Sequence, residues 1–289
     1  NLAWVRNCTS PNGIGINGAV IDTVANKLYV AGVYINSCML DTCMLSGLYS
    51  GGFLSQWDLD GHCLWASNAV TSGPDLANHF CTTTAVTVDL QGHVFVGGYT
   101  TPYGPNYLAG RLVPEGTYMS AYTATGDTIW TRMLALYQDA STNFQPLTMG
   151  VRNGALFAYG RVYLNSEYDT LVVDTVAVTG FHGSGHALFR MDPVNGYMDW
   201  LRVDGYPHSG ASLFTPQQLY LDNSGNSYVA CGYGDMAIFG TDTILSSYAG
   251  GFLAEYDSDG MLQWVRNFVA TGSAGFASLC GSSDGGLKV

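Results

Sequence analysis

Aspartates recur in short turns of this 289-residue chain, and carboxylate oxygens are ligands that Ca²⁺ prefers. The segments Asp58-Leu59-Asp60-Gly61 and Asp257-Ser258-Asp259-Gly260 resemble the start of a calcium loop. A calcium site needs about six to eight oxygens, including a bidentate carboxylate further along, and neither segment supplies one. We therefore expect both segments to be tight turns that join neighbouring strands.

Two other groups of residues could in principle do chemistry. His182 and His186 have the i, i+4 spacing that binds zinc when a helix aligns the side chains, but two glycines between them favour a loop. The segment Gly281-Ser282-Ser283-Asp284-Gly285 fits the pattern of a nucleophile elbow, but no helix is expected after it. No spacing unites a catalytic triad or a carboxylate pair. We therefore assign no catalytic, cofactor-binding or metal-binding residue and expect no cofactor.

The chain has seven cysteines, an odd number, and no Cys-x-x-Cys pair of the kind that binds zinc. Cys38 and Cys43 flank four residues and could close a small disulfide loop in an oxidising compartment. The alternative is that the cysteines are small buried apolar residues. The sequence leaves both interpretations open.

Composition excludes several classes of function and favours β-structure. The chain has 10 Lys and Arg against 22 Asp and Glu, a net charge of −12, so it lacks the basic face of a nucleic-acid binder. No apolar stretch approaches the roughly 20 residues that span a bilayer. Glu and Lys, which favour helices, are rare, whereas the 37 Gly and 19 Tyr favour turns and strands. The composition predicts an all-β protein.

A repeat of about 65 residues organises the chain. Five tryptophans lie 61, 65, 70 and 64 residues apart, and Arg follows most of them by two positions. A hairpin-type turn precedes most of these tryptophans, and a second hairpin follows each about twenty residues later. The repeated tryptophans are Trp4, Trp65, Trp130, Trp200 and Trp264. Four strands per repeat predict a β-propeller, whose stacked blades cover both faces of each inner sheet.

The repeat boundaries predict four complete blades and a partial fifth. We place the repeats at approximately 4–64, 65–129, 130–199, 200–263 and 264–289, within one propeller domain over residues 1–289. Each repeated Trp is expected to pack between adjacent blades. Because Leu287-Lys288-Val289 aligns with an inner strand, we expect Val289 to lie in an incomplete blade and the chain to form part of a larger propeller.

Two segments carry a family resemblance that covers essentially the whole chain. Asp222 to Ala230 and Phe252 to Asp257 resemble the SBBP repeat, a bacterial seven-bladed β-propeller repeat. The middle repeats depart from the pattern, because Arg152-Asn153-Gly154 replaces the D-x-x-G turn and Pro193 lies in another turn. The resemblance implies a secreted or outer-membrane-associated protein of Bacteroidota, exported by the type IX secretion system. It implies adhesion or binding and transfers no catalytic residue.

Asp-Thr followed by an aliphatic residue occurs five times and resembles the O-glycosylation acceptor of Bacteroidota. The acceptor threonines would be Thr23, Thr128, Thr170, Thr175 and Thr243. The alternative is that Asp ends a turn and Thr begins a strand, which a β-protein needs repeatedly.

These observations lead to three hypotheses for function. The first is a non-enzymatic secreted or cell-surface propeller that acts as a scaffold, an adhesin or a module binding a protein or glycan partner. The second is a glycan-active hydrolase or lyase whose carboxylates converge at the central face. The third is a cargo or accessory component of a bacterial secretion assembly. No hypothesis includes a nucleic acid or a direct membrane span.

Overall fold

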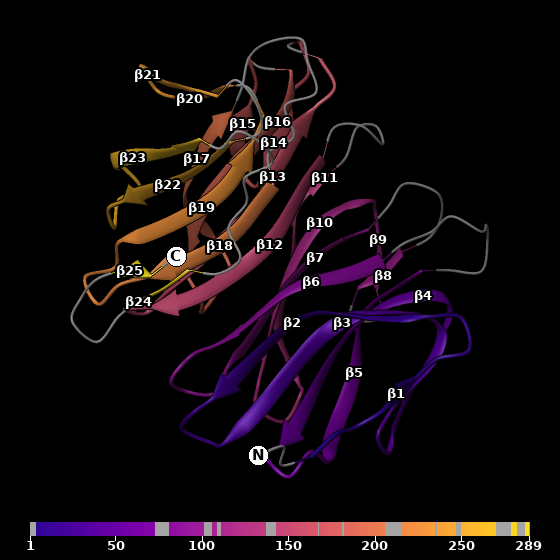
Figure 1. Cartoon of the computed structure of the whole chain (residues 1–289). Coiled ribbons are helices and arrows are strands. Elements are labelled where there is room, and N and C mark those ends of the chain that lie inside the picture. The colour runs from indigo at the N-terminus through magenta and orange to yellow at the C-terminus, as the bar shows by residue number, and fades with distance from the viewer. Residues whose placement is uncertain are drawn as a thin grey trace. The chain divides into compact units, whose positions relative to one another are not determined.

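The computed structural model describes most of the chain as β-strands (Figure 1). The described residues are 4–72, 81–100, 106–108, 111–136, 143–166, 168–180, 182–205, 215–234, 236–246, 250–269, 279–281 and 287–288. All regular elements in these ranges are strands, so the predicted all-β class is confirmed. Within the same ranges, no helix is long and apolar enough to cross a membrane. The chain divides into two compact units, Asn1–Ala140 and Ser141–Val289.

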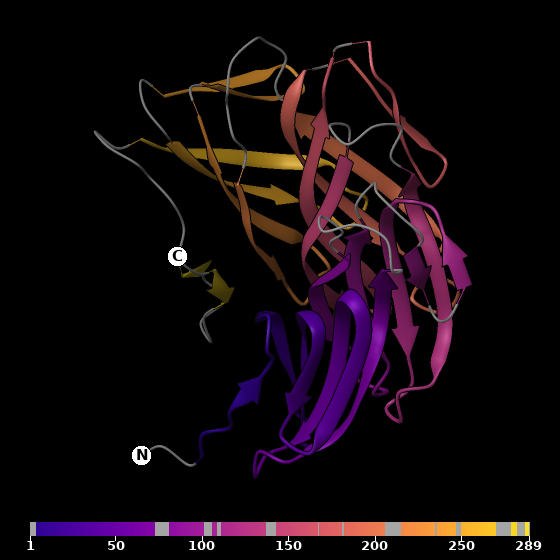
Figure 2. The same cartoon turned by 90° about the vertical axis from the view of Figure 1, so that its right-hand side faces the viewer.

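The first unit contains two antiparallel four-stranded arrays (Figure 2). The first array runs in the order β2 (Ile14–Asp22), β3 (Lys27–Leu40), β4 (Cys43–Asp58) and β5 (Cys63–Ser72). The second runs in the order β6 (Cys81–Val88), β7 (Val94–Thr100), β10 (Gly116–Tyr122) and β11 (Thr128–Leu136). Short additions to the first array are β1 (Cys8–Thr9), which pairs with β3, and the hairpin β8 (Asn106–Leu108) and β9 (Arg111–Val113), which pairs with β5.

The second unit repeats this arrangement. One four-stranded array is β12 (Asn143–Arg152), β13 (Ala155–Leu164), β16 (Gly183–Met191) and β17 (Met198–Gly205). The other is β18 (Thr215–Leu221), β19 (Ser227–Tyr233), β22 (Gly250–Tyr256) and β23 (Leu262–Val269). The sequence of this unit also contains three hairpins: β14 (Leu171–Val173) with β15 (Val176–Val178), β20 (Met236–Phe239) with β21 (Asp242–Leu245), and β24 (Cys280–Gly281) with β25 (Leu287–Lys288).

The four-stranded arrays agree with the predicted four strands per repeat, but each array starts and ends at other residues than the predicted repeat. The arrays span 14–72, 81–136, 143–205 and 215–269, so each ends with a Trp strand, whereas the predicted repeats begin with one. The reason is the hairpin turn before each Trp, which pairs the Trp strand with the strand that precedes it. Trp4 precedes the first strand, Val289 lies outside the described residues, and the single domain over 1–289 stays a prediction.

A β-bulge recurs between the first and second strands of every array. The register shifts at the bulged residues Asn17, Thr84, Leu147 and Gln217. In the first three arrays glycine lies opposite the bulge, because the backbones approach closely there, and Cys231 takes this position in the fourth. A Cβ added to Gly32 would lie 2.1 Å from the carbonyl oxygen of Gly15, and one added to Gly98 would lie 2.0 Å from that of Thr82. This close approach explains the glycine that ends the repeated Tyr-Val-Ala-Gly pattern.

The first and last arrays share a Tyr–Gly–Asn arrangement that the sequence analysis did not predict. The hydroxyl of Tyr34 donates to Asn68 Oδ1, and its ring lies over Gly51, where a Cβ would come within 2.8 Å of the ring. Tyr233, Gly250 and Asn267 make the same arrangement. The three residues are 17 positions apart in both cases. Asn68 also donates to the Ser46 carbonyl and Asn267 to that of Leu245, so this arrangement ties outer hairpins to the arrays.

The repeated tryptophans form the joints between arrays within each unit. The indole N–H of Trp65 donates to the Ala124 carbonyl in the next array's hairpin turn at 3.2 Å. Trp200 donates in the same way to the Ser258 carbonyl at 3.3 Å. Trp4 donates to the Leu59 carbonyl at 2.7 Å and so fills the corresponding turn of the first array. In each case the acceptor is the second residue of the turn.

The Arg two residues after the Trp completes the joint. Arg202 Nε donates to the Gly260 carbonyl at 2.8 Å, and its Nη2 donates to the Asp259 carbonyl at 3.0 Å. Arg6 makes the same pair of contacts with Gly61 and Asp60 at 2.6 and 3.2 Å. The joints of Arg6 and Arg202 therefore satisfy turn carbonyls with donors from a Trp-x-Arg segment, whereas Ser67 stands in place of the Arg in the Trp65 joint. We call this arrangement the Trp-x-Arg joint.

The glycine of each turn is required both by backbone conformation and by the Trp ring. Gly260 has a φ of +76°, and a Cβ added there would come within 2.9 Å of the Trp200 ring. Gly154 has a similar φ of +72°, but nothing lies within 4 Å of an added Cβ. Alanine variants at the two glycines therefore distinguish the destabilisation caused by a left-handed backbone from that caused by displacing the Trp ring.

We predict that Gly154→Ala lowers the free energy of unfolding by about 1 kcal/mol, because only the left-handed conformation is penalised. Gly260→Ala should cost at least about 1–2 kcal/mol more, because the new methyl group displaces Trp200 and weakens the Arg202 hydrogen bonds. Urea denaturation of both variants measures the difference. Equal losses would show that the joint contributes nothing to stability.

Candidate functional site

The aspartates of the predicted turns are engaged by the turns themselves. Asp257 Oδ1 accepts from the backbone N–H groups of Asp259 and Met261 at 3.0 and 2.9 Å. Asp58 Oδ1 accepts from the backbone N–H of His62 at 2.8 Å, and this bond is the main reason that the pKa of Asp58 lies below its ordinary value. These contacts are those of Asx-type turns, in agreement with the turn interpretation.

The other sequence candidates do not come together as metal or catalytic centres. His186 is buried in β16, whereas His182 is exposed just before that strand. Four residues of a strand span roughly 13 Å, so the pair does not converge as it would on a helix. Residues 282–285 lie outside the described residues. Across the described part of the chain, no group of three His, Cys, Asp or Glu side chains could hold a metal ion.

A pocket of about 320 Å³ in the second unit brings several polar side chains together. β17 contributes Arg202 and Asp204, and the end of β22 contributes Tyr256. The hairpin β20–β21 contributes Phe239 and Asp242. This volume is at the lower end of the range of ligand pockets. The pocket thus combines two carboxylates, a phenol and a guanidinium.

Two lining residues that are far apart in sequence, Tyr256 and Asp204, form a hydrogen bond. Tyr256 donates its hydroxyl to Asp204 Oδ2 at 2.5 Å, and Tyr256 is only 1% exposed. Burial, and next the nearby Asp204 carboxylate, raise the pKa of Tyr256 well above its ordinary value. The phenol therefore stays protonated at neutral pH and holds the carboxylate in place.

His186 of β16 lies opposite Asp204 of β17 in the strand register. Its ring packs against three aromatic rings, with centroid distances of 5.6 Å to Tyr159, 5.5 Å to Phe239 and 5.1 Å to Phe252. Burial lowers the pKa of His186 to about 4, and the Asp204 carboxylate opposes that shift only in part. His186 is therefore a neutral core residue at pH 7.

The free edges of the pocket suit a ligand rich in hydroxyl groups. Asp242 is exposed at the rim and can accept hydrogen bonds, as can the free oxygen of Asp204. Phe239 borders the pocket but is only 2% exposed, so its ring belongs chiefly to the core next to the pocket. Arg202 faces the pocket while its guanidinium is held by the Trp-x-Arg joint. Sequence reasoning missed this site because its residues come from three separate hairpins with no shared local motif.

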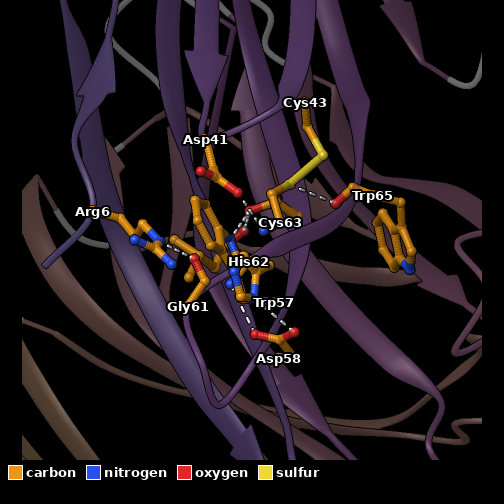
Figure 3. Close-up of a disulfide and its surroundings, with 11 residues drawn as sticks. Arg6, Asp41, Cys43, Trp57, Asp58, Gly61, His62, Cys63 and Trp65 are labelled. Carbon is orange, nitrogen blue, oxygen red and sulfur yellow. Dashed lines mark hydrogen bonds and ion pairs between the residues drawn. A yellow bond between two sulfur atoms is a disulfide. The ribbon is translucent and has the colours of Figure 1, made fainter. Parts of the chain in front are cut away.

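The predicted pairing of Cys38 with Cys43 is wrong. The disulfide joins Cys43 to Cys63, with a Cα–Cα distance of 6.1 Å (Figure 3). Cys38 is a buried free thiol opposite Leu45, and burial raises its pKa to about 11. Because Cys38 and Cys43 lie near the tip of the β3–β4 hairpin but are not opposite each other, the partner of Cys43 comes from the neighbouring strand β5.

The Asp-Thr threonines lie in turns or at the edges of strands. Thr23, Thr128, Thr175 and Thr243 are exposed, and Thr170 is half-buried just before β14. Exposure suits a modification site, and the positions equally suit strand starts. The glycosylation of these residues therefore stays a prediction.

Comparison with known proteins gives no family assignment. No family model matches the chain, and no curated protein matches it. The chain has distant similarity to a quinohemoprotein alcohol dehydrogenase from Comamonas testosteroni, with 13% identity and a TM-score of 0.36 over 85% of this chain. It is similarly close to the rhamnogalacturonan lyase YesW, with 12% identity and a TM-score of 0.35 over 87% of this chain. The chain spans about half of each protein, 52% in both cases, and the SBBP assignment stays a prediction.

The lowered pKa of His186 predicts a pH-dependent stability. The unfolded state takes up a proton near pH 6.5, whereas the folded state resists protonation until about pH 4. Stability should therefore fall as the pH drops below 6.5, by about 2 kcal/mol between pH 7 and pH 5 from this residue. Denaturant titrations of the wild type, His186→Phe and the exposed control His182→Asn measure it. The prediction fails if His186→Phe keeps the same pH dependence as the other two proteins.

Proposed function

We propose that this chain is a non-enzymatic, secreted or cell-surface β-propeller that binds a glycan in the Asp204–Tyr256 pocket. The lining of this pocket carries the proposal. Sugars present several hydroxyl groups, which match the carboxylate acceptors Asp204 and Asp242 and the guanidinium of Arg202 in this lining. The held carboxylate of Asp204 gives the site a fixed acceptor, so a ligand need not order it on binding.

The contacts between arrays within each unit support a propeller arrangement. First strands lie beside first strands: Asn17 of β2 donates to Thr82 Oγ1 and the Thr83 carbonyl of β6 at 3.0 and 2.8 Å. In the second unit, Arg152 of β12 donates to the Asp222 carbonyl just after β18 at 3.1 Å. The last strands carry the Trp-x-Arg joints to the next array. Inner strands in contact and outer strands joined at their turns fit radially stacked blades.

The disulfide and the sequence resemblance support export from the cytoplasm. Disulfides persist in oxidising compartments, and Cys43–Cys63 is a disulfide between neighbouring strands. The SBBP-like repeats fit type IX secretion in Bacteroidota and a place at the outer membrane. The same features fit the alternative that the protein is a cargo or accessory component of a secretion assembly.

Mass spectrometry of the protein from its natural host tests this location. We expect a nonreduced digest to link the peptides of Cys43 and Cys63 and to leave Cys38 as a thiol. We expect hexose-containing masses on peptides that carry exposed threonines such as Thr175 or Thr243. Reduced Cys43 and Cys63, with unmodified masses at every Asp-Thr site, would contradict an exported glycoprotein.

Binding to immobilised oligosaccharides tests the pocket. Asp204→Asn and Asp242→Asn should each weaken binding at least tenfold, because each removes a carboxylate acceptor from the lining. Asp199→Asn is the matched control, since Asp199 lies on the same strand and pairs with Arg190 outside the pocket at 3.2 Å. Equal affinity of all variants, or no binding to any oligosaccharide, would overturn the proposed site.

One observation favours a glycan-active enzyme as a second candidate: Asp204 and Asp242 line the same pocket. Glycosidases use two carboxylates about 5–10 Å apart as acid and base or nucleophile. When oligosaccharides are incubated with the protein and analysed, new reducing ends would indicate a hydrolase, and new unsaturated sugars would indicate a lyase. Turnover that is lost in both Asp204→Asn and Asp242→Asn would favour the enzyme, and binding without turnover favours the binding module.

A further inference from the structure

The joints of Trp4, Trp65 and Trp200 follow one chemical pattern, with an Arg two residues after the Trp in the first and the third. The indole N–H reaches the carbonyl of the second turn residue, which is Leu59, Ala124 or Ser258. The turn glycine lies against the indole ring in all three joints. These second residues are uncharged, and the groups that contact them from the joint are donors. A Trp-x-Arg segment is therefore a receptor for a glycine-containing hairpin turn.

The last array carries the same segment, and no hairpin turn of the described residues bonds to it. Trp264-Val265-Arg266 on β23 repeats the residue types of Trp4-Val5-Arg6. The Arg266 guanidinium lies 5.8 Å from the centroid of the Trp264 ring, much as Arg202 lies 5.5 Å from that of Trp200. The side chains are thus arranged as in a filled joint. Among the described residues, however, no turn carbonyl accepts a hydrogen bond from Trp264 or Arg266.

The Trp264 ring packs against residues of its own array, whereas the strand beyond it is more exposed than the matching part of β5. The Trp264 ring packs 6.2 Å from that of Tyr228, and Trp264 also packs on the cluster of Ala230, Leu253 and Leu279. Leu279 leads into the β24–β25 pair. Further along β23, Phe268 opposite Gly251 is 43% exposed, whereas Val70, opposite Gly52 at the matching register position of β5, is 1% exposed. The far half of β23 therefore lacks the cover that β5 has.

We infer that Trp264 and Arg266 form a docking site for a D-x-x-G hairpin turn of a partner polypeptide. The site offers an N–H donor, a guanidinium and a flat ring, and such a turn supplies carbonyl acceptors and a glycine without a side chain. A second copy of this chain is not the favoured occupant. Its described turns at 58–61, 123–126 and 257–260 are already filled by Trp4, Trp65 and Trp200. In its D-x-x-G turns at 89–92 and 222–225, the glycines already face Ala124 and Asn153 of the same chain.

One neighbouring residue restricts the partner further. In two filled joints the residue opposite the Trp adds a second donor to the turn: Gln56 to the Ala124 carbonyl at 3.0 Å and Arg190 to the Ser258 carbonyl at 3.2 Å. Glu255 has this position opposite Trp264, and its carboxylate accepts from the Tyr228 hydroxyl at 2.9 Å. A carboxylate there disfavours an acidic second turn residue, because like charges repel.

The test uses the whole chain and a backbone-cyclised hairpin peptide that copies residues 252–263. This peptide contains the Asp257–Gly260 turn with its uncharged second residue and lacks a tryptophan. Calorimetry measures affinity, and the indole N–H resonance of Trp264 reports the place of binding. We expect Trp264→Ala and the exposed-site variant Arg266→Gln to weaken binding at least tenfold. The peptide with Gly260→Ala should bind at least tenfold more weakly to the wild type.

Several results would overturn this inference. Absence of binding at millimolar peptide, or equal binding by Trp264→Ala and Arg266→Gln, would remove the site. Protection of the Trp264 indole N–H from exchange in the free chain would show that another segment of the chain already fills it. Self-association that Arg266→Gln abolishes would assign the site to a second copy and not to a partner.

Discussion

The contact between an indole ring and a turn glycine is the interaction on which the arrays of this protein depend. An isolated four-stranded sheet exposes apolar faces and unpaired edges, so each array needs a neighbour. The Trp-x-Arg joint supplies one by fixing the outer strand of one array to the turn of another. It uses groups that every hairpin turn leaves available: carbonyl oxygens, and the flat surface beside a residue without a side chain. The same joint can therefore recur although the rest of each repeat has diverged.

The joint also shapes the pocket. Arg202 binds the carbonyls of Asp259 and Gly260 and lines the pocket, and Gly260 and Met261 of that turn line it too. The turn that fixes one array to the next thus forms part of the wall around Asp204. If the proposed glycan binds there, its affinity and the stability of the joint are linked, because a ligand that contacts this wall binds only while the turn is in place.

The acidity of the chain is in part a consequence of its turns. Aspartates at the starts of hairpin turns accept backbone N–H groups that would otherwise lack partners, as Asp89, Asp192 and Asp222 do. Each repeat therefore needs aspartates for local geometry. The net charge of −12 then reflects fold construction as well as any surface function. The carboxylates that remain for ligands are those away from turn starts, and Asp204 is the clearest of them.

The sequence by itself determined the features that depend on local physics. Alternating strands, Asx-type turns and the repeated Trp-x-Arg segments follow from backbone conformation and from groups a few residues apart, so the all-β class and the four-stranded unit were predictable. Tertiary structure decided which distant groups meet. Cys63 and not Cys38 joins Cys43, and Asp204 meets Tyr256 from 52 residues away, because strand register and array packing bring them together. Local patterns carry no information on such pairs, since the same turn and strand residues are compatible with many registers.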